Sequence, residues 1–548
     1  MKKHKIYNAL CYSLIMVIFS VMCFYISKKE GFHEDEIFSY GSSNYRYDNI
    51  FQPYGNKDYI NKCIDELILN NKNVINNILY YIKEPNEFIN ELNEIQSKEK
   101  PIWKTKEEAI EYVSIQKEDI LNFFIVYYNQ VRDAHPPLFY FLVHIVSILF
   151  LNNFSKYIIF IINIILFLLS IIIIKKILEL LNKETLFMPI IILWGLSIGG
   201  ISTVIFQRMY MMLTFFIIYY TYINIYIVKN DFHMDKNTKT KLTLTIILGF
   251  LTQYYFCIYI LFFFITMQIL MLKKNKKKEC KTLLICHIKS AIIGIIVFPA
   301  AIYHIFFSYR GVTNITNQYR IIDFFKIICE SYNLNIIIGI IIFISITTFS
   351  ILVLKKNKDC IPCILLITII GYVLVIAKIS PYLDLRYVMG ILPIISITII
   401  FAIDYYFKNN FKVICITSGI LFIISIINLY YIDPYYLYKG YNENVEIARK
   451  YSDFKYIYIE DNSFNHIQSI PEFMIYNKSI ILNANKDELK YLYNNEELKQ
   501  EKEFIVSIKR YMNVEEILKQ VLKLTERENY TLLLDGSNET GNVIYRIY

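Results

Sequence analysis

Long apolar runs alternate with short lysine-rich stretches along this chain, and this alternation constrains its fold more than any other feature. A helix needs about 20 apolar residues to cross the hydrocarbon core of a bilayer, which is about 30 Å thick. Of the 548 residues, 55% are hydrophobic and only 19% are charged, whereas soluble domains carry about 25% charged residues. The pattern therefore predicts a mainly α-helical, polytopic membrane bundle.

The net charge of +9 does not indicate a nucleic-acid-binding protein, because the lysines lie between the apolar runs rather than on one soluble face. Short cytoplasmic loops are rich in Lys and Arg. We therefore place the lysine-rich loops and the N-terminus on the cytoplasmic side. Lys28 and Lys29 then fall outside, but they open a long loop, where this rule is weak.

This placement of the lysines determines which apolar segments cross. The run 242–272 has to leave and return, because as one helix it would measure about 46 Å. Two helices that meet near Gln253 and Tyr254 are predicted instead. The segment 136–151 begins with two prolines and is predicted to be interfacial or re-entrant, without crossing. The predicted spans, about eleven in number, are 6–26, 155–174, 186–205, 209–228, 242–253, 255–272, 284–305, 335–354, 361–378, 388–407 and 413–431.

The C-terminal tail then lies outside. In it, Asn513 with Glu516 predicts a capped helix that runs to about Leu524. Strands are predicted at Tyr456–Glu460, Ser479–Leu482, Phe504–Ile508, Thr531–Leu534 and Val543–Tyr548. We expect residues 432–548 to form a small extracytoplasmic α/β domain.

The first loop, residues 27–154, is the other large extracytoplasmic region, and we assign it to the membrane domain at 1–431. Its stretch 57–118 is rich in Asn, Lys and Glu and is interpreted as an insertion of unknown role. Within it, Thr105 with Glu108 predicts a capped helix.

The first candidate for chemistry follows the first span, where Glu34, Asp35 and Glu36 stand together. Adjacent carboxylates at a membrane surface repel one another, so a solvated loop is the simplest interpretation. The alternative is a general base whose neighbours shape its site or raise its pKa. The spacing alone does not separate these two interpretations.

Further clusters combine basic with acidic or aromatic residues at the outer ends of spans. A helix start explains the prolines after His135, and a lone outer arginine is common. Basic side chains at headgroup level can, however, pair with a lipid phosphate. The clusters are Asp133 with His135, Arg208 with Tyr210, and Asp384 with Arg386 and Tyr387.

In their order along the chain, these pieces resemble the GT-C class of membrane glycosyltransferases, in particular the protein O-mannosyltransferase and aminoarabinose-transferase-like family. The resemblance extends over residues 6–430, and His-Pro-Pro-Leu after an Asp-Glu is its most specific part. Two positions depart from the family, with Phe206 in place of a frequent Glu and Gln253 or Tyr254 in place of a frequent His. The matching motifs are Asp35-Glu36, Asp133-Ala134-His135-Pro136-Pro137-Leu138, Arg208-x-Tyr210, Gln253-Tyr254-Tyr255 and Arg386-Tyr387 with Pro393.

The resemblance implies the GT-C fold and the transfer of a sugar from polyprenyl phosphate to an acceptor hydroxyl, with inversion. It implies that Asp35 is the general base and that Glu36 shapes the site or raises the pKa of the base. Arg208, Arg386 and His135 would neutralise the leaving phosphate. The other implied donor-binding residues are Asp133, Tyr210, Tyr254 and Tyr387.

Several properties stay open in the sequence. A divalent cation near Asp35, Glu36 and Asp133 is neither predicted nor ruled out, and no other cofactor is indicated. The sugar is undetermined, and the acceptor is a protein, a lipid or a cell-wall glycan. The alternative function is a non-enzymatic lipid or polysaccharide exporter with an outer sensor domain, against which the scarcity of charged residues inside the predicted spans counts.

Overall fold

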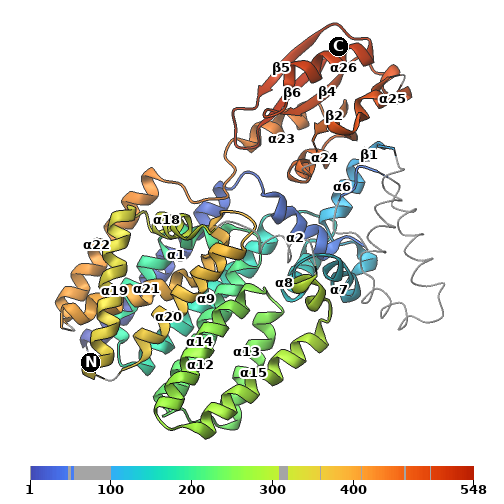
Figure 1. The fold of residues 1–548 in the computed structure, drawn as a ribbon. Coiled ribbons are helices and arrows are strands. Elements are labelled where there is room, and N and C mark those ends of the chain that lie inside the picture. Colours follow the sequence, from blue (N-terminus) through green and yellow to red (C-terminus); the bar gives the residue numbers. More distant parts are fainter. Residues whose placement is uncertain are drawn as a thin grey trace, which may run out of the picture. The chain divides into compact units, whose positions relative to one another are not determined.

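The computed structural model describes residues 2–46, 51–54, 100–307, 319–357, 359–408, 410–461, 464–493 and 495–548. The contacts divide the chain into two compact units, each described by itself (Figure 1). The helical unit comprises Met1–Ser27, Ala134–Phe139 and Lys156–Tyr435. The sheet unit comprises Lys28–Asp133, Tyr140–Ser155 and Tyr436–Tyr548.

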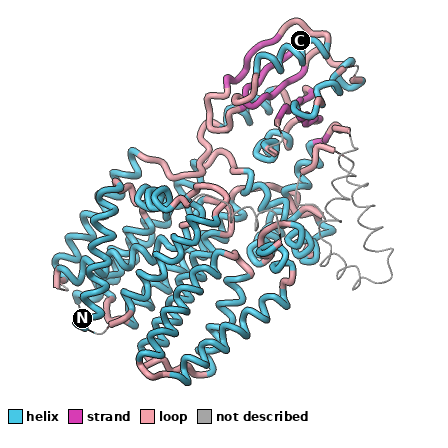
Figure 2. The backbone as a smooth tube through the Cα atoms, in the orientation of Figure 1, coloured by secondary structure: helices cyan, strands magenta, loops and turns pink. Residues whose placement is uncertain are grey.

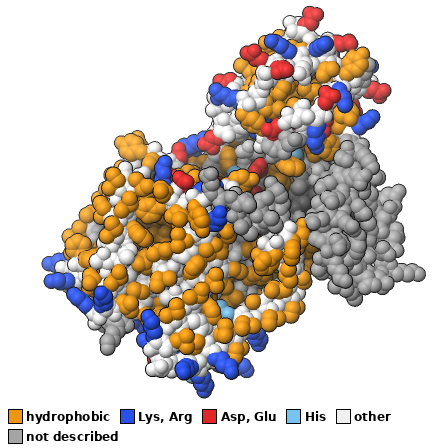
Figure 3. Space-filling model, in the orientation of Figure 1, with side chains coloured by type: hydrophobic (Ala, Val, Ile, Leu, Met, Phe, Trp, Pro, Cys, Tyr) orange, Lys and Arg blue, Asp and Glu red, His pale blue; other side chains and the backbone are white. Residues whose placement is uncertain are grey.

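Apolar runs form the long helices of the helical unit (Figure 2), and hydrophobic side chains cover much of its visible face (Figure 3). Within the described residues, nine helices are long and apolar enough to cross a membrane. The chain is therefore a multi-pass membrane protein, and these helices overlap nine of the predicted spans. They are α1 (Lys2–Lys28), α9 (Tyr157–Leu180), α12 (Tyr210–Lys229), α14 (Tyr255–Lys273), α15 (Lys277–Val297), α19 (Ile336–Asn357), α20 (Ile361–Ile379), α21 (Leu392–Tyr406, preceded by the 3-10 turn η6, Met389–Ile391) and α22 (Phe411–Tyr431).

The predicted span 186–205 is broken rather than continuous. Helix α10 (Phe187–Gly195) and helix α11 (Ile198–Ile205) meet at a bend of 68°. The hydroxyl of Ser197 accepts the N–H of Gly200 at 2.9 Å and so starts a new helix. A Cβ at Gly200 would lie 1.9 Å from the Trp194 carbonyl oxygen, so only glycine fits there. With this pair counted as one span, the described residues hold up to ten spans, against about eleven predicted from the apolar runs.

The predicted hairpin between 242 and 272 is confirmed. Helix α13 (Lys236–Phe250) and helix α14 are separated by a turn that contains Gln253 and Tyr254. The side chain of Asp235 accepts the N–H of Thr238 at 2.8 Å and starts α13 six residues before the predicted span. Because α13 has 15 residues and a lysine-rich first half, it is not among the helices long enough to cross.

Prolines set two further boundaries. Helix α8 (Leu138–Ser147) starts after Pro136-Pro137 and, with the 3-10 turn Ile148–Phe150, is too short to span a bilayer, as predicted for 136–151. The predicted span 284–305 is instead two helices, because Pro299 follows the end of α15 and precedes α16 (Ala300–Phe306).

The sheet unit contains a sheet with the strand order β1-β3-β2-β4-β6-β5. Strands β3, β2 and β4 are parallel, whereas β6 and β5 are antiparallel additions. Asn513 caps α26 (Val514–Thr525) by accepting the N–H of Glu516, as predicted. The tail strands agree with the prediction to within one residue and are β2 (Lys455–Glu460), β3 (Lys478–Asn483), β4 (Phe504–Lys509), β5 (Tyr530–Asp535) and β6 (Asn542–Ile547).

The first loop contributes to the same sheet. Its strand β1 (Lys104–Thr105) pairs antiparallel with β3, so the loop belongs with the tail rather than with the membrane helices to which the sequence assigned it. The predicted cap of Thr105 and Glu108 is confirmed at the start of α6. Residues 57–99 of the supposed insertion lie outside the described part of the chain. The helices of the loop are α2 (Glu34–Asn44), α6 (Lys106–Val113) and α7 (Phe123–Arg132).

Candidate active site

The candidate base Asp35 lies in the first turn of α2. His33 is the N-cap, and its Nδ1 accepts the N–H of Asp35 at 3.0 Å. In return, the N–H of His33 donates to Glu36 Oε2 at 2.7 Å. This reciprocal capping box explains why the helix begins here, and carboxylates in a first turn also interact favourably with the helix dipole. The three adjacent acids therefore start a helix rather than forming a solvated loop.

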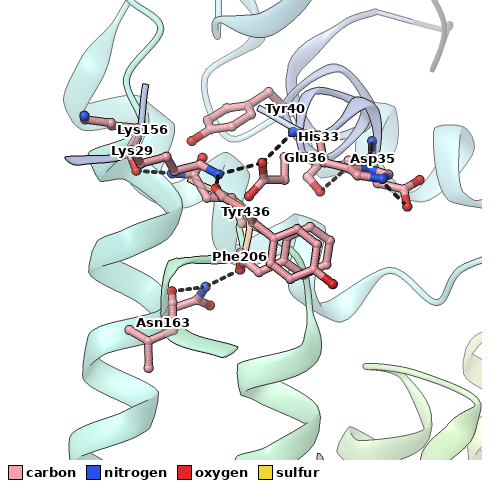
Figure 4. A network of polar contacts seen from close by, with 12 residues as sticks. Lys29, His33, Asp35, Glu36, Tyr40, Lys156, Asn163, Phe206 and Tyr436 are labelled. Atoms are coloured by element: carbon pink, nitrogen blue, oxygen red, sulfur yellow. Dashed lines mark hydrogen bonds and ion pairs between the residues drawn. The ribbon is translucent and has the colours of Figure 1, made fainter. Parts of the chain in front are cut away.

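Asp35 and Glu36 are neighbours in sequence but differ in burial. The Glu36 side chain is 0% exposed and forms a 2.9 Å ion pair with the equally buried Lys29. The Asp35 side chain is 22% exposed, and its Oδ2 lies 3.7 Å from Nδ1 of His33. Figure 4 shows the Asp35 and Glu36 side chains pointing in different directions from the start of α2. Asp35 is thus accessible to a substrate, whereas Glu36 is enclosed by protein.

Lys29 has a second partner in the tail. Its Nζ donates to the Tyr436 carbonyl oxygen at 2.5 Å, in addition to Glu36 (Figure 4). Burial lowers the pKa of Lys29, and the carboxylates of Glu36 and Glu539 oppose this effect.

Arg208 lies in the short connection between α11 and α12. The Asn163 amide, from α9, donates to the carbonyls of Val204 and Phe206 at 3.0 and 2.9 Å and so fixes the end of α11 (Figure 4). The guanidinium of Arg208 is buried, and its Nη2 lies 3.4 Å from Nε2 of His135. Two of the predicted phosphate-binding residues are therefore neighbours.

A second cluster surrounds Tyr255, the first residue of α14. Its ring packs edge-on against Tyr387 with 5.4 Å between the centroids. The guanidinium of Arg386 lies 5.2 Å from the centroid of the Tyr387 ring. Two predicted donor-binding residues, Arg386 and Tyr387, thus lie together, and Tyr387 packs against Tyr255, a tyrosine that the sequence singled out only as part of a motif.

Tyr254, at the tip of the α13–α14 hairpin, has a partner that was not predicted from the sequence. Its hydroxyl lies 2.9 Å from Nδ1 of His304 on α16. Many members of the resembled family carry a histidine at the hairpin tip itself. In this chain, a histidine from α16 reaches the tip instead.

Asp133 ends α7, where its N–H donates to the carbonyls of Asn129 and Gln130 at 3.1 and 3.2 Å. It belongs to the sheet unit with Asp35 and Glu36. Among the residues that the structure describes, no group of three His, Cys, Asp or Glu side chains is arranged to hold a metal ion. The remaining predicted site residues belong to the helical unit and are His135, Arg208, Tyr210, Tyr254, Arg386 and Tyr387.

Comparison with known proteins gives matches of fold only. No family model matches the sequence, and neither does any curated protein. The structure of ArnT from Cupriavidus metallidurans bound to undecaprenyl phosphate is similar, with a TM-score of 0.47, 8% identity and coverage of 75% of this chain and 87% of that chain. The apo structure of the same protein gives a TM-score of 0.44 and 9% identity over the same shares. ArnT is an aminoarabinose transferase of the GT-C class, the class that the motifs resemble. A similarity of this size assigns neither an activity nor residue roles to this chain.

Proposed function

We propose that this chain is a membrane glycosyltransferase that moves a sugar from a polyprenyl-phosphate donor to an acceptor hydroxyl on the extracytoplasmic face. The observation that carries the proposal is the contrast between Asp35 and Glu36. One carboxylate is partly exposed and held at a helix start, and its neighbour is buried against Lys29. The buried pair of Glu36 and Lys29 holds the first turn of α2, and it leaves the neighbouring Asp35 carboxylate open to an acceptor hydroxyl, which is the placement that a general base needs.

In the proposed reaction, Asp35 takes the proton of the acceptor hydroxyl as that oxygen attacks the anomeric carbon of the donor sugar. The bond from the anomeric carbon to the phosphate oxygen breaks, and polyprenyl phosphate leaves with the electron pair. A single displacement with one base inverts the anomeric configuration. A positioned general base contributes about 10²- to 10⁴-fold to the rate of such a step.

The departure of the phosphate depends more on neutralisation of its negative charge by cations than on protonation by an acid. Arg208 with its neighbour His135, and Arg386 among its tyrosines, are the proposed cationic groups. Charge-assisted hydrogen bonds from such groups to phosphate are stronger than neutral ones. The other proposed donor-binding residues are Asp133, Tyr210, Tyr254 and Tyr387.

The test is turnover of radiolabelled polyprenyl-phosphate sugars, as a panel of pentoses and hexoses, by the purified full-length protein. Asp35→Asn should lower turnover by about 100-fold or more while donor binding is kept. The matched control is Glu107→Gln, because Glu107 holds the same second position in α6, with a side chain 64% exposed. This variant should turn over as the wild type does.

Two results would contradict the proposal. Full activity of Asp35→Asn would remove Asp35 as the base. Wild-type protein that neither binds nor turns over any donor, with protein, lipid and glycan acceptors all supplied, would remove the transferase function and favour the exporter.

A further inference from the structure

Residues 29–33, called here the base loop, pack against residues 436–441, called the tail segment. Both belong to the sheet unit. Hydrogen bonds join them from Lys29 Nζ to the Tyr436 carbonyl (2.5 Å), from the Glu30 N–H to the Leu437 carbonyl (2.9 Å), and from the Gly440 N–H to the Glu30 carboxylate (2.7 Å). The base loop is thus bound along its length by a segment from the far end of the sequence.

Side-chain packing closes the same junction. A Cβ at Gly31 would lie 2.9 Å from Cβ of Tyr438 and 2.9 Å from Cγ of Tyr441, so the two segments touch without spare room. The Lys29 ammonium lies 5.3 Å from the centroid of the Tyr438 ring and 5.6 Å from that of Phe32. The cation is therefore held between aromatic faces as well as by its hydrogen bonds.

From Lys29, a short series of contacts leads to the candidate base. Oε2 of Glu36 accepts from both Lys29 Nζ and the N–H of His33. The ring of His33 in turn accepts the N–H of Asp35. Each link is at least partly buried, so the contacts between Lys29 and Asp35 are largely shielded from solvent.

We infer that Lys29 is a positioning residue for Asp35, which it ties, through Glu36 and His33, to the tail segment. The tail is accordingly a working part of the transferase site. Lys29 is fully buried and does not touch substrate itself. This inference rests on the proposed function, since it assigns a role only if Asp35 is the base.

A purely structural ion pair makes a different prediction from a positioning one. Loss of stability alone lowers the amount of active enzyme, and it leaves the turnover per folded molecule and the donor KM unchanged. Misplacement of a base by about 1 Å can cost up to 100-fold in rate, and it lowers kcat while the donor is bound as before. The split between kcat and donor KM therefore separates the two roles.

The experiment measures kcat and donor KM of the full-length protein, per folded molecule, for Lys29→Met, Glu36→Gln and the double variant. Lys29→Met should lower kcat roughly 10- to 100-fold at unchanged donor KM, because the unpaired Glu36 carboxylate then moves toward water. The double variant should regain only part of this loss, because a glutamine at the third helical position still accepts in a capping box, whereas the bond from Lys29 to the tail segment is still absent. Lys104→Met is the matched control, since Lys104 pairs with Glu108 in the capping box of α6, and it should keep the wild-type kcat.

A second variant covers the case in which Lys29→Met does not fold. Gly31→Ala pushes the base loop away from the tail segment and should lower kcat at unchanged donor KM. Gly419→Ala is its control, because a Cβ at Gly419 meets nothing within 4 Å.

The possible outcomes test this inference separately from the proposed function. Wild-type kcat in Lys29→Met or Gly31→Ala, beside an inactive Asp35→Asn, overturns the positioning role and leaves the transferase standing. Losses that multiply in the double variant, instead of being partly regained, overturn transmission through Glu36. Activity in Asp35→Asn itself would remove the base, and the inference with it.

Discussion

Helices α2 and α6 both begin with a capping box, and in both the glutamate of that box is paired with a lysine. The N-caps are His33 and Thr105, the glutamates are Glu36 and Glu108, and the lysines are Lys29 and Lys104. The ion pairs measure 2.9 Å in α2 and 3.4 Å in α6. Both helices are in the sheet unit, so the same local chemistry can be compared in two settings.

The two helix starts differ in burial. Both side chains of the α2 pair are 0% exposed, whereas those of the α6 pair are 8% and 25% exposed. Lys29 is also bonded to the tail at Tyr436. An exposed ion pair contributes about 0–1 kcal/mol, but a buried one becomes costly when one partner is lost. The capping box therefore starts a helix in both places, and burial decides how rigidly the first turn is held.

The largest effect is expected when the glutamate of each box is removed. Glu36→Ala leaves the Lys29 cation buried without its counter-ion and should lower the free energy of unfolding by about 3–5 kcal/mol. Glu108→Ala loses a cap and a part-exposed pair and should cost about 1 kcal/mol. Thermal unfolding of the two purified proteins measures both, and equal shifts would abolish the distinction drawn from burial.

Replacing the two N-caps should have a smaller effect on stability and should sharpen the functional side of the comparison. His33→Ala and Thr105→Ala should each cost about 1 kcal/mol, the usual value for a lost N-cap. Only His33→Ala should also reduce kcat, because its imidazole holds the N–H of Asp35. A fall in kcat of the same size in Thr105→Ala would show that any loosened helix in this unit impairs turnover.

The smallest expected effect is a difference in pH dependence. The pKa of Lys29 lies below 10.5 because of burial, despite the facing carboxylates of Glu36 and Glu539. The folded chain therefore releases this proton before the unfolded chain does. As pH rises toward 10.5, the contribution of Lys29 to the free energy of unfolding rises, because the unfolded state binds more protons there.

Activity should change in the opposite direction, since neutral Lys29 no longer pairs with Glu36. The measurement compares kcat and the unfolding midpoint of the wild type and of the Lys29→Met, Glu36→Gln double variant from about pH 7 to pH 10. The double variant should lack this part of the alkaline fall in kcat. An identical alkaline limb in both proteins would assign the fall to another group.

Much of the fold is predictable because it follows from periodicity. Apolar runs located nine of the spans, and alternation located the tail strands to within one residue. The break between α10 and α11 was not predicted, because Ser197 and the glycines after it lie in a run that is apolar enough for one continuous helix. Strand β1 was not predicted either, because two residues show no periodicity and their partner strand lies far along the chain.

The candidate site residues were predictable from the sequence where the functional groups stand in adjacent positions. Asp35 beside Glu36, and the motifs of Arg208 and Arg386, stand out as sequences. Lys29 and His304 did not, because their partners Tyr436 and Tyr254 are brought to them only by folding. Burial, which separates the role proposed for Asp35 from that of Glu36, likewise has no local sequence signal.

The bond between Lys29 and Tyr436 joins residues 407 positions apart, and this has a consequence for biosynthesis. At typical rates of translation, the ribosome takes roughly 20 to 80 s to make the intervening chain. During that time α2 lacks the anchor for its first turn, while every membrane helix up to α22 is being inserted. The proposed base, Asp35, therefore gains the tail contact of its helix only in a chain that has been completed to its tail, and a product truncated within the membrane helices carries Asp35 without that contact.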